Sequence, residues 1–341
     1  MNRRLFFLSM SGLAGCTRSS RPRLNVLNWS DYVAEETIPR FEREFNVRVH
    51  YGVFESGEEM LARVMSGNSG WDVVFPANYF IRPMVELGLL ARVDHSRLPN
   101  SGALEPRFQS PPWDPKLEWC VPYMWGATGI VYQTALNPPV TGWGDLWDQR
   151  FKGRLTMLDD PAEVLGAALK KLGYSLNSGD APQLNQARQQ AEAQKPLLRA
   201  YANETVRDQV VAGELLAAQA WRSTAMRAID AAQGRLTFSY PSEGYPLYAD
   251  NMAILHESRR TELAHTFINY LLRPEVASEI ASSKLESTVN AAARARLPQP
   301  MRESPILYPE EETLRRGEWF QPLSVEAQRF RDRIWTEIKA S

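Results

Sequence analysis

The sequence predicts an α/β protein of two domains, each built on a mostly parallel sheet flanked by helices. The chain has 341 residues, a length that corresponds to about two domains. Hydrophobic residues make up 44% of the chain and charged residues 23%, which is typical of a folded globular protein. From residue 24 onward, segments with the period of a strand alternate with segments with the period of a helix, and this alternation favours parallel strands covered by helices.

The first part of the alternation begins at a short apolar run, and each segment is assigned by its period. Ile38, Phe41 and Phe45 recur at helical spacing, so one side of the segment 33–45 faces a core. In chain order, the expected elements are a strand at 24–29, a helix at 33–45, a strand at 47–54, a helix at 58–65, a strand at 71–75 and a helix at 80–90.

The same rhythm returns after residue 153. Pro196 ends one helical segment, and Pro274 separates two others. Between the two parts, the chain after Trp113 is irregular, and the run 121–129 is interpreted as a crossing between the domains. The expected elements are strands at 154–158, 215–221, 236–240 and 252–255, and helices at 162–172, 183–194, 223–232, 261–272, 274–282 and 325–339.

Residues 1–22 have the features of an export signal followed by a tether. Arg3 and Arg4 precede an apolar stretch, 5–13, that is too short to span a bilayer as a helix. The sequence Leu-Ala-Gly-Cys that ends at Cys16 resembles the lipobox of bacterial lipoproteins, in which the cysteine carries the lipid. We therefore expect a lipid-anchored protein on the periplasmic or cell-surface side of a bacterial membrane. The alternatives are cleavage elsewhere with Cys16 incidental, and export by either the general or the twin-arginine route.

Composition and motifs argue against several classes of protein. The formal net charge is -1, whereas a nucleic-acid binder that works by bulk charge is strongly basic. The two cysteines, Cys16 and Cys120, form no metal-binding or redox pair, and the four histidines lack ligand spacing. Dinucleotide, P-loop, zinc-protease and nucleophile-elbow motifs are absent. We expect no catalytic residues, no metal and no cofactor, and Cys120 is interpreted as a small buried residue.

A set of aromatic and acidic residues falls at the expected strand ends. Open α/β sheets bind ligands at the carboxyl ends of their strands. Aromatic faces attract cations and pack on methylene chains, and carboxylates pair with ammonium groups. A ligand with ammonium ends and an alkyl middle would use both. The set comprises Trp29, Asp31, Tyr32, Tyr79, Asp160, Glu163, Trp221, Tyr248 and Asp250.

Each member of the set also has an ordinary structural interpretation. Trp29 suits a core position. Asp160, followed by Pro161 and then Glu163, has the pattern of a helix start with an N-cap. Asp31 suits an exposed turn, and the segment 248–250 suits a loop before a strand. Local pattern leaves both interpretations open.

A resemblance to a known protein family gives this set of aromatic and acidic residues one specific interpretation. Nearly all of the chain after residue 22 resembles the bacterial spermidine/putrescine-binding proteins of ABC transporters. The matching stretches are LNWSDYVAEETIPRFEREFNVRVHYGVFESGEEM, WDVVFPANYFI, VPYMWGATGI, GRLTMLDDPAEVLGAALKKLGYS, FINYLLRPEVA and RRGEWF.

The resemblance implies a two-lobed periplasmic-binding-protein fold of type II, which closes on a polyamine and presents it to an inner-membrane permease. Lobe one would comprise residues 23–124 and 248–291, and lobe two 125–247 and 292–341. Residue by residue, the aromatic and acidic set matches the family's ligand contacts. Tyr248 stands where family members carry Trp or Phe, and Asp31 matches an acid of the putrescine-preferring branch.

Three positions depart from the family pattern. Thr224 stands where putrescine-preferring relatives carry Asp, and Phe320 stands where spermidine-preferring relatives carry Gln. Glu286 falls where both branches carry an aromatic residue. It is either a surface residue, the interpretation that we favour from sequence, or an added carboxylate for an inner amine of the ligand. The preferred polyamine therefore stays open.

Three other functions remain as alternatives. A glycoside hydrolase would need paired acids at a defined separation. The same fold could bind an amino acid, a sugar or a metal ion, and an amino acid would need a cation for its carboxylate. A polyamine-sensing lipoprotein would share every feature described above.

Overall fold

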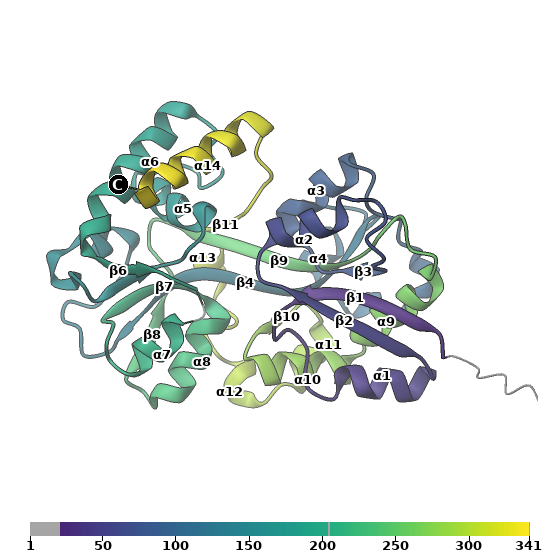
Figure 1. Ribbon diagram of the computed structural model, residues 1–341. Coiled ribbons are helices and arrows are strands. Elements are labelled where there is room, and N and C mark those ends of the chain that lie inside the picture. Colours follow the sequence, from purple (N-terminus) through teal and green to yellow (C-terminus); the bar gives the residue numbers. More distant parts are fainter. Residues whose placement is uncertain (1–20, 204, 341) are drawn as a thin grey trace, which may run out of the picture.

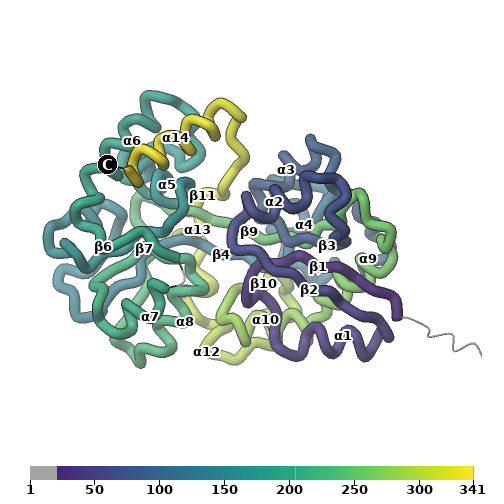
Figure 2. The backbone as a smooth tube through the Cα atoms, viewed as in Figure 1, coloured from purple at the N-terminus to yellow at the C-terminus, as the bar shows by residue number. Residues whose placement is uncertain are grey.

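Two lobes joined by long strands make up the computed structural model, which describes residues 21–203 and 205–340 (Figure 1). The connecting strands are β4 (Cys120–Gln133) and β9 (Tyr245–Ile254). The signal and anchor expected at residues 1–16, with Cys16, lie outside the described residues. Figure 2 shows the same division along the backbone, with the first and the last parts of the chain on different lobes.

The first lobe is built on three parallel strands in the order β2-β1-β3, to which β9 adds antiparallel. In Figure 1, α2 and α3 lie on one side of this sheet, and α1 and α9 lie on the other. The elements are β1 (Arg23–Trp29), β2 (Arg48–Phe54), β3 (Val73–Val74), α1 (Thr37–Phe45), α2 (Gly57–Val64), α3 (Asn78–Glu86), α4 (Pro106–Gln109) and α9 (Thr261–Leu271).

The second lobe repeats this plan with the parallel order β6-β5-β7. Helices α5, α6 and α14 pack together on one side of the sheet, and α7 and α8 lie on the other (Figure 1). The elements are β5 (Leu155–Met157), β6 (Leu198–Tyr201), β7 (Ala217–Trp221), β8 (Leu236–Ser239), α5 (Pro161–Lys171), α6 (Ala181–Gln194), α7 (Val206–Val211), α8 (Arg222–Ala232) and α14 (Val325–Ala340).

Strand β4 belongs to both sheets. Its first half pairs with β9, and its second half, from Thr128 onward, pairs with β7 and β8. The predicted crossing at 121–129 is therefore confirmed, as one continuous strand. The remaining elements surround this junction: β10 (Ser287–Thr288), β11 (Gly317–Trp319), α10 (Pro274–Lys284), α11 (Ala291–Arg296), α12 (Gln299–Arg302) and α13 (Glu311–Leu314).

Apolar stripes account for the packing of the helices. On α1, Phe41 is buried and its ring lies 5.0 Å from that of Phe267 on α9. The C-terminal helix α14 buries Ile334 and Ile338 as its period predicts. Cys120 is buried, as expected, and no helix among the residues described has the length and apolar character of a membrane span.

Some boundaries differ from the sequence expectation, for local reasons. Helix α1 starts at Thr37 instead of residue 33, which keeps Pro39 within the first turn, where its missing N–H costs nothing. Helix α3 ends at Glu86, ahead of Gly88 with its positive φ of 67°. The prediction of a short strand at 252–255 was wrong in extent, because β9 begins seven residues earlier, at Tyr245.

Candidate functional site

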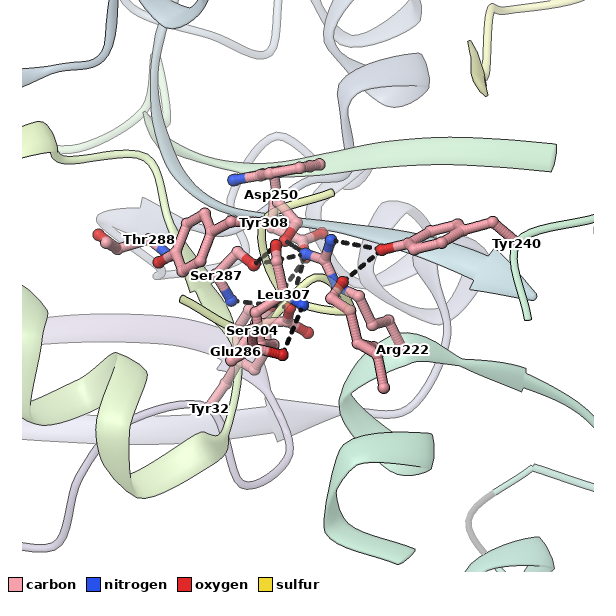
Figure 3. Close-up of polar contacts among 12 residues, drawn as sticks. Tyr32, Arg222, Tyr240, Asp250, Glu286, Ser287, Thr288, Ser304, Leu307 and Tyr308 are labelled. Atoms are coloured by element: carbon pink, nitrogen blue, oxygen red, sulfur yellow. Dashed lines mark hydrogen bonds and ion pairs between the residues drawn. The ribbon is translucent and has the colours of Figure 1, made fainter. Parts of the chain in front are cut away.

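Asp250 is a buried carboxylate on the first-lobe side of the junction. It lies inside β9, two residues from Tyr248, so both side chains point to the same face of the strand. The loop interpretation of 248–250 is therefore wrong. The Tyr32 hydroxyl donates a hydrogen bond of 2.6 Å to Asp250 Oδ2 (Figure 3). Burial raises the pKa of Asp250 to about 7, and the charge of Glu286 adds to this rise, whereas the bond from Tyr32 opposes it.

Two half-buried aromatic residues accompany this carboxylate. Trp29 ends β1 and packs on Phe54, with ring centroids 4.5 Å apart. Its indole Nε1 is buried, and the Trp29 side chain lies close enough to Asp250 to lower the pKa of that carboxyl. Tyr32 is held by Tyr123, whose hydroxyl donates a hydrogen bond of 2.7 Å to the Tyr32 carbonyl. Packing and hydrogen bonding thus fix both aromatic residues beside Asp250.

The second lobe contributes Asp160 and Glu163 from the start of α5. Asp160 is the N-cap, and its Oδ1 accepts from the amides of Ala162 and Glu163 at 2.8 and 3.0 Å. The capping interpretation is therefore confirmed. Because Oδ1 alone makes these bonds, the second oxygen of this part-exposed residue remains for other contacts.

Two hydrogen-bond donors hold one carboxylate oxygen of Glu163. Its Oε1 accepts from the Thr128 hydroxyl at 2.7 Å and from Trp221 Nε1 at 3.1 Å. Its Oε2 is buried and unpartnered within the described ranges. Burial, and next the charge of Asp160, raise the pKa of Glu163 well above its usual value, against the effect of the two hydrogen bonds. Trp221 at the end of β7 is therefore tied directly to the carboxylate.

Tyr79 is under the electrostatic influence of carboxylates from both lobes. It is half-buried near the start of α3, and its ring packs edge-on against Phe320 with centroids 5.6 Å apart. Its pKa is raised by burial and by the charges of Asp160, Glu58, Glu163 and Asp250, in that order. Tyr79 therefore belongs, by its electrostatics, to the same group as these carboxylates.

Tyr248 lies across Gly126 of the paired strand β4. A Cβ placed on Gly126 would stand 2.3 Å from the Tyr248 hydroxyl, so only glycine leaves room for the ring in this position. Burial raises the pKa of Tyr248, and the charge of Glu286 is the next cause. Tyr248 therefore lies within the same group as Asp250 and Glu286.

Two candidates lie differently from the rest. Asp31 has a positive φ of 52°, its side chain is 70% exposed, and it forms an ion pair with Lys284. The structure thus places it in an exposed turn, outside the group of buried carboxylates. Glu286 is the opposite case: the surface position favoured from sequence is wrong, because its side chain is 1% exposed.

Three charged residues near the site were missed by sequence reasoning. Arg222 is completely buried and paired with Glu286 (Figure 3). Arg331 of α14 is buried, and its charge lowers the pKa of Asp160. Glu58 of α2 lies close enough for Asp160 to raise its pKa, after the larger effect of burial. Their partners are far away in sequence, so no local pattern identifies them, although Arg222 directly follows Trp221.

The arrangement offers acceptors for cations. Within residues 21–203 and 205–340, no three histidine, cysteine or acidic side chains gather as a metal cluster. Acids from the two lobes lie among half-buried aromatic rings, and at least one carboxylate oxygen lacks a donor. Such a group suits a ligand with ammonium groups and apolar surface between them.

Comparison with known proteins agrees with this arrangement. The family model for bacterial extracellular solute-binding proteins matches residues 36–307. The spermidine/putrescine-binding periplasmic protein of Salmonella typhimurium is 33% identical over 311 residues, which cover 90% of this chain and 89% of the relative.

Two solved structures have the same fold over nearly their whole length. A structure described as a spermidine/putrescine ABC transporter from Listeria monocytogenes superposes with a TM-score of 0.88 at 31% identity, over 93% of this chain and 98% of the other. The TpPotD lipoprotein of Treponema pallidum superposes with a TM-score of 0.83 at 28% identity, over 93% and 99%.

Proposed function

The chain belongs to the bacterial extracellular solute-binding proteins, in the family that includes the spermidine/putrescine-binding periplasmic proteins, and we propose that it binds a polyamine for an ABC transporter. Its role is to bind and deliver a solute, without catalysis. The observation that carries the proposal is the placement of buried carboxylates from both lobes, Asp250 and Glu163, among half-buried aromatic rings.

The ligand-binding residues in this proposal divide by chemistry. Asp250 receives one terminal ammonium group, and Glu163 with Asp160 receives the other. Glu163 Oε2 supports this assignment, since it is a buried acceptor without a donor in the described chain. The rings pack against the methylene chain between the amines: Trp29, Tyr32, Tyr79, Trp221 and Tyr248.

Ligand capture follows from the two-lobed plan. Asp250 on the first lobe and Asp160 with Glu163 on the second can each form an ion pair with a cation that lies between the lobes. Closure of the lobes removes water, which strengthens these pairs. We propose lobe boundaries at residues 23–124 with 248–291 and 125–247 with 292–341, and β4, shared by both sheets, supports a boundary near its middle.

The geometry favours amines over amino acids as ligands. An amino acid needs a cation that is free to meet its carboxylate. Arg222 is 0% exposed and is paired with Glu286, and Arg331 is buried with a hydrogen bond of 3.0 Å to the Leu176 carbonyl. Acidic groups, by contrast, come from both lobes.

Attachment through a lipid on Cys16 is part of the proposal. The Leu-Ala-Gly-Cys sequence supports it, as does the similarity to the TpPotD lipoprotein. Replacing Cys16 by Ser would release the protein from membranes into the soluble fraction. Retention of that variant in membranes would contradict lipid anchoring at this residue.

Calorimetric titration tests the polyamine assignment. Mature protein, extracted in mild detergent and dialysed free of amines, would be titrated with spermidine, putrescine, spermine and a diol as long as putrescine. Saturable binding of an amine without binding of the diol supports the proposal. Absence of heat with every amine would mean that the fold is kept and the ligand is different.

A further inference from the structure

Arg222 and Glu286 form an ion pair that is closed off from solvent beside the ligand-binding residues (Figure 3). Their side chains are 0% and 1% exposed, and Arg222 Nη2 lies 3.1 Å from Glu286 Oε1. Arg222 begins α8, directly after Trp221, whereas Glu286 lies between α10 and β10. A buried ion pair is costly to form unless further hydrogen bonds satisfy its remaining donors and acceptors.

The arginine is held by the protein on several sides. Its Nη2 also donates to the Trp125 carbonyl at 2.7 Å and to the Ser287 hydroxyl at 2.8 Å. Its Nη1 donates to the Tyr240 hydroxyl at 3.3 Å, and the guanidinium lies 4.4 Å from the centre of the Trp125 ring. The position of this cation is therefore set before any ligand arrives.

The carboxylate is engaged on one oxygen. Glu286 Oε1 accepts from Arg222 Nη2 and, at 2.9 Å, from the amide of Ser287. Oε2 is buried and has no donor among the described residues. An ionised oxygen that is removed from water without a hydrogen-bond donor is strongly unfavourable. This half of the carboxylate therefore lacks a partner.

The electrostatic influence of Glu286 places it at the Asp250 end of the site. Among charged groups, Glu286 has the largest effect on Asp250 and on Tyr248, and it also acts on Tyr32. Asp250 accepts the hydrogen bond from Tyr32, so two carboxylates and two tyrosines gather here. A single terminal ammonium group would satisfy Asp250 and leave Glu286 Oε2 unpaired.

We propose that Glu286 Oε2 accepts a hydrogen bond from a second ammonium group of the ligand, beside the one that Asp250 receives. The site therefore binds a triamine with an inner secondary ammonium more tightly than a diamine. This inference rests on the proposed function and names the ligand class within it. Arg222 is a positioning residue: it holds Oε1, leaves Oε2 for the ligand and offsets part of the repulsion between Glu286 and Asp250.

The test is Glu286→Gln, measured by calorimetric titration of the mature protein with spermidine and putrescine. Glutamine keeps the size of the side chain and an oxygen for Arg222, but removes the charge. We expect spermidine affinity to fall by about tenfold or more and putrescine affinity by less than about threefold. The matched control is Glu279→Gln, because Glu279 is a part-exposed residue of α10 paired with Arg40 and should leave both affinities unchanged.

Glu286→Gln leaves Arg222 buried without its charged partner, which destabilises the protein. A second variant therefore separates the loss of binding from the loss of stability. The double variant Arg222→Met with Glu286→Leu removes both charges at similar volume. It should show the same selective loss of spermidine. A ratio of spermidine to putrescine affinity that stays at the wild-type value in either folded variant would overturn the inference.

The wild-type protein separates this inference from the proposed function. If it binds neither amine, the polyamine assignment itself fails. If it binds putrescine more tightly than spermidine, the assignment stands and the role of Glu286 is overturned.

Discussion

At the scale of single residues, one side chain has two separable tasks. Asp160 caps α5 through Oδ1, and the same carboxylate is proposed to meet an ammonium group. Capping needs an acceptor atom, whereas ligand binding needs a negative charge. A substitution that keeps the acceptor and removes the charge therefore distinguishes the two tasks.

We expect Asp160→Asn to retain the stability of the protein and to lower polyamine affinity by more than about tenfold, since asparagine caps helices as well as aspartate does. Asp160→Ala should lower affinity similarly and also cost about 1 kcal/mol of unfolding free energy. Urea unfolding and titration of both variants measure these effects. Asp230→Asn, on the exposed side of α8, is the control. Wild-type affinity in Asp160→Asn would leave this residue with its capping role alone.

The raised pKa values of the buried acids predict a pH dependence of binding. Asp250, with a pKa of about 7, and Glu163, whose pKa is also raised, are largely protonated at pH 6 in the free protein. Binding of an ammonium group must displace those protons, so affinity should rise with pH between about 6 and 8, by up to tenfold per pH unit for each proton released. Titrations in buffers of different ionisation enthalpy count the protons. A flat profile with no proton release would contradict the raised pKa values.

The same shifts have a consequence for stability. Between the unfolded pKa values, near 4, and the raised folded values, the folded state binds more protons than the unfolded state. These acids therefore stabilise the ligand-free fold at low pH and lose that contribution as pH rises through about 7. Asp250→Asn should reduce this loss.

At the scale of elements, the strand pair β4 and β9 carries much of the site. These two strands are antiparallel partners, and Gly126 stands directly opposite Tyr248 in the register. The ring of Tyr248 lies over the bare Cα of Gly126, so the backbone of β4 and the side chain of β9 form one unit.

We expect Gly126→Ala to displace Tyr248, because the added Cβ would lie 2.3 Å from the tyrosine hydroxyl. The predicted cost is about 1–3 kcal/mol of unfolding free energy, together with weaker polyamine binding. Chemical unfolding of Gly126→Ala in the wild-type and Tyr248→Ala backgrounds measures the coupling. The cost should largely vanish in the Tyr248→Ala background, and an equal cost in both would place the strain elsewhere.

At the scale of the whole molecule, the two lobes share a strand and a charged centre. β4 pairs with both sheets, and Arg222 connects α8 with the carbonyl of Trp125 and with Ser287. If one lobe unfolded, β4 would lose its strand partners in that lobe, and the sheet of the other lobe would be disrupted because it contains the same strand. The lobes should therefore unfold together.

We expect a single thermal transition that polyamine moves upward. At a ligand concentration one hundred times Kd, mass action adds about 2.7 kcal/mol to the unfolding free energy. Scanning calorimetry with and without spermidine checks both points. Two transitions, of which spermidine moves one, would show that the ligand contacts one lobe and that β4 does not couple them.

The sequence by itself determined the features that depend on local pattern. Hydrophobic period identified most strands and helices of the two sheets, but it missed β6 and α7 and placed the start of β9 seven residues too late. Asp160 with Pro161 marked the start of α5. The quoted stretches identified the family and supplied the set of proposed ligand contacts. These signals lie within a turn or a few residues of chain, where backbone geometry and capping act.

Only the tertiary structure decided how distant residues meet. Glu286 is buried and paired with Arg222, which lies 64 residues away in the sequence. Asp31 lies in an exposed turn, where it forms an ion pair with Lys284. Tyr248 and Asp250 share a face because β9 extends past the predicted strand. Burial, pairing and pKa depend on which segments the topology places together, and no local period or cap encodes that.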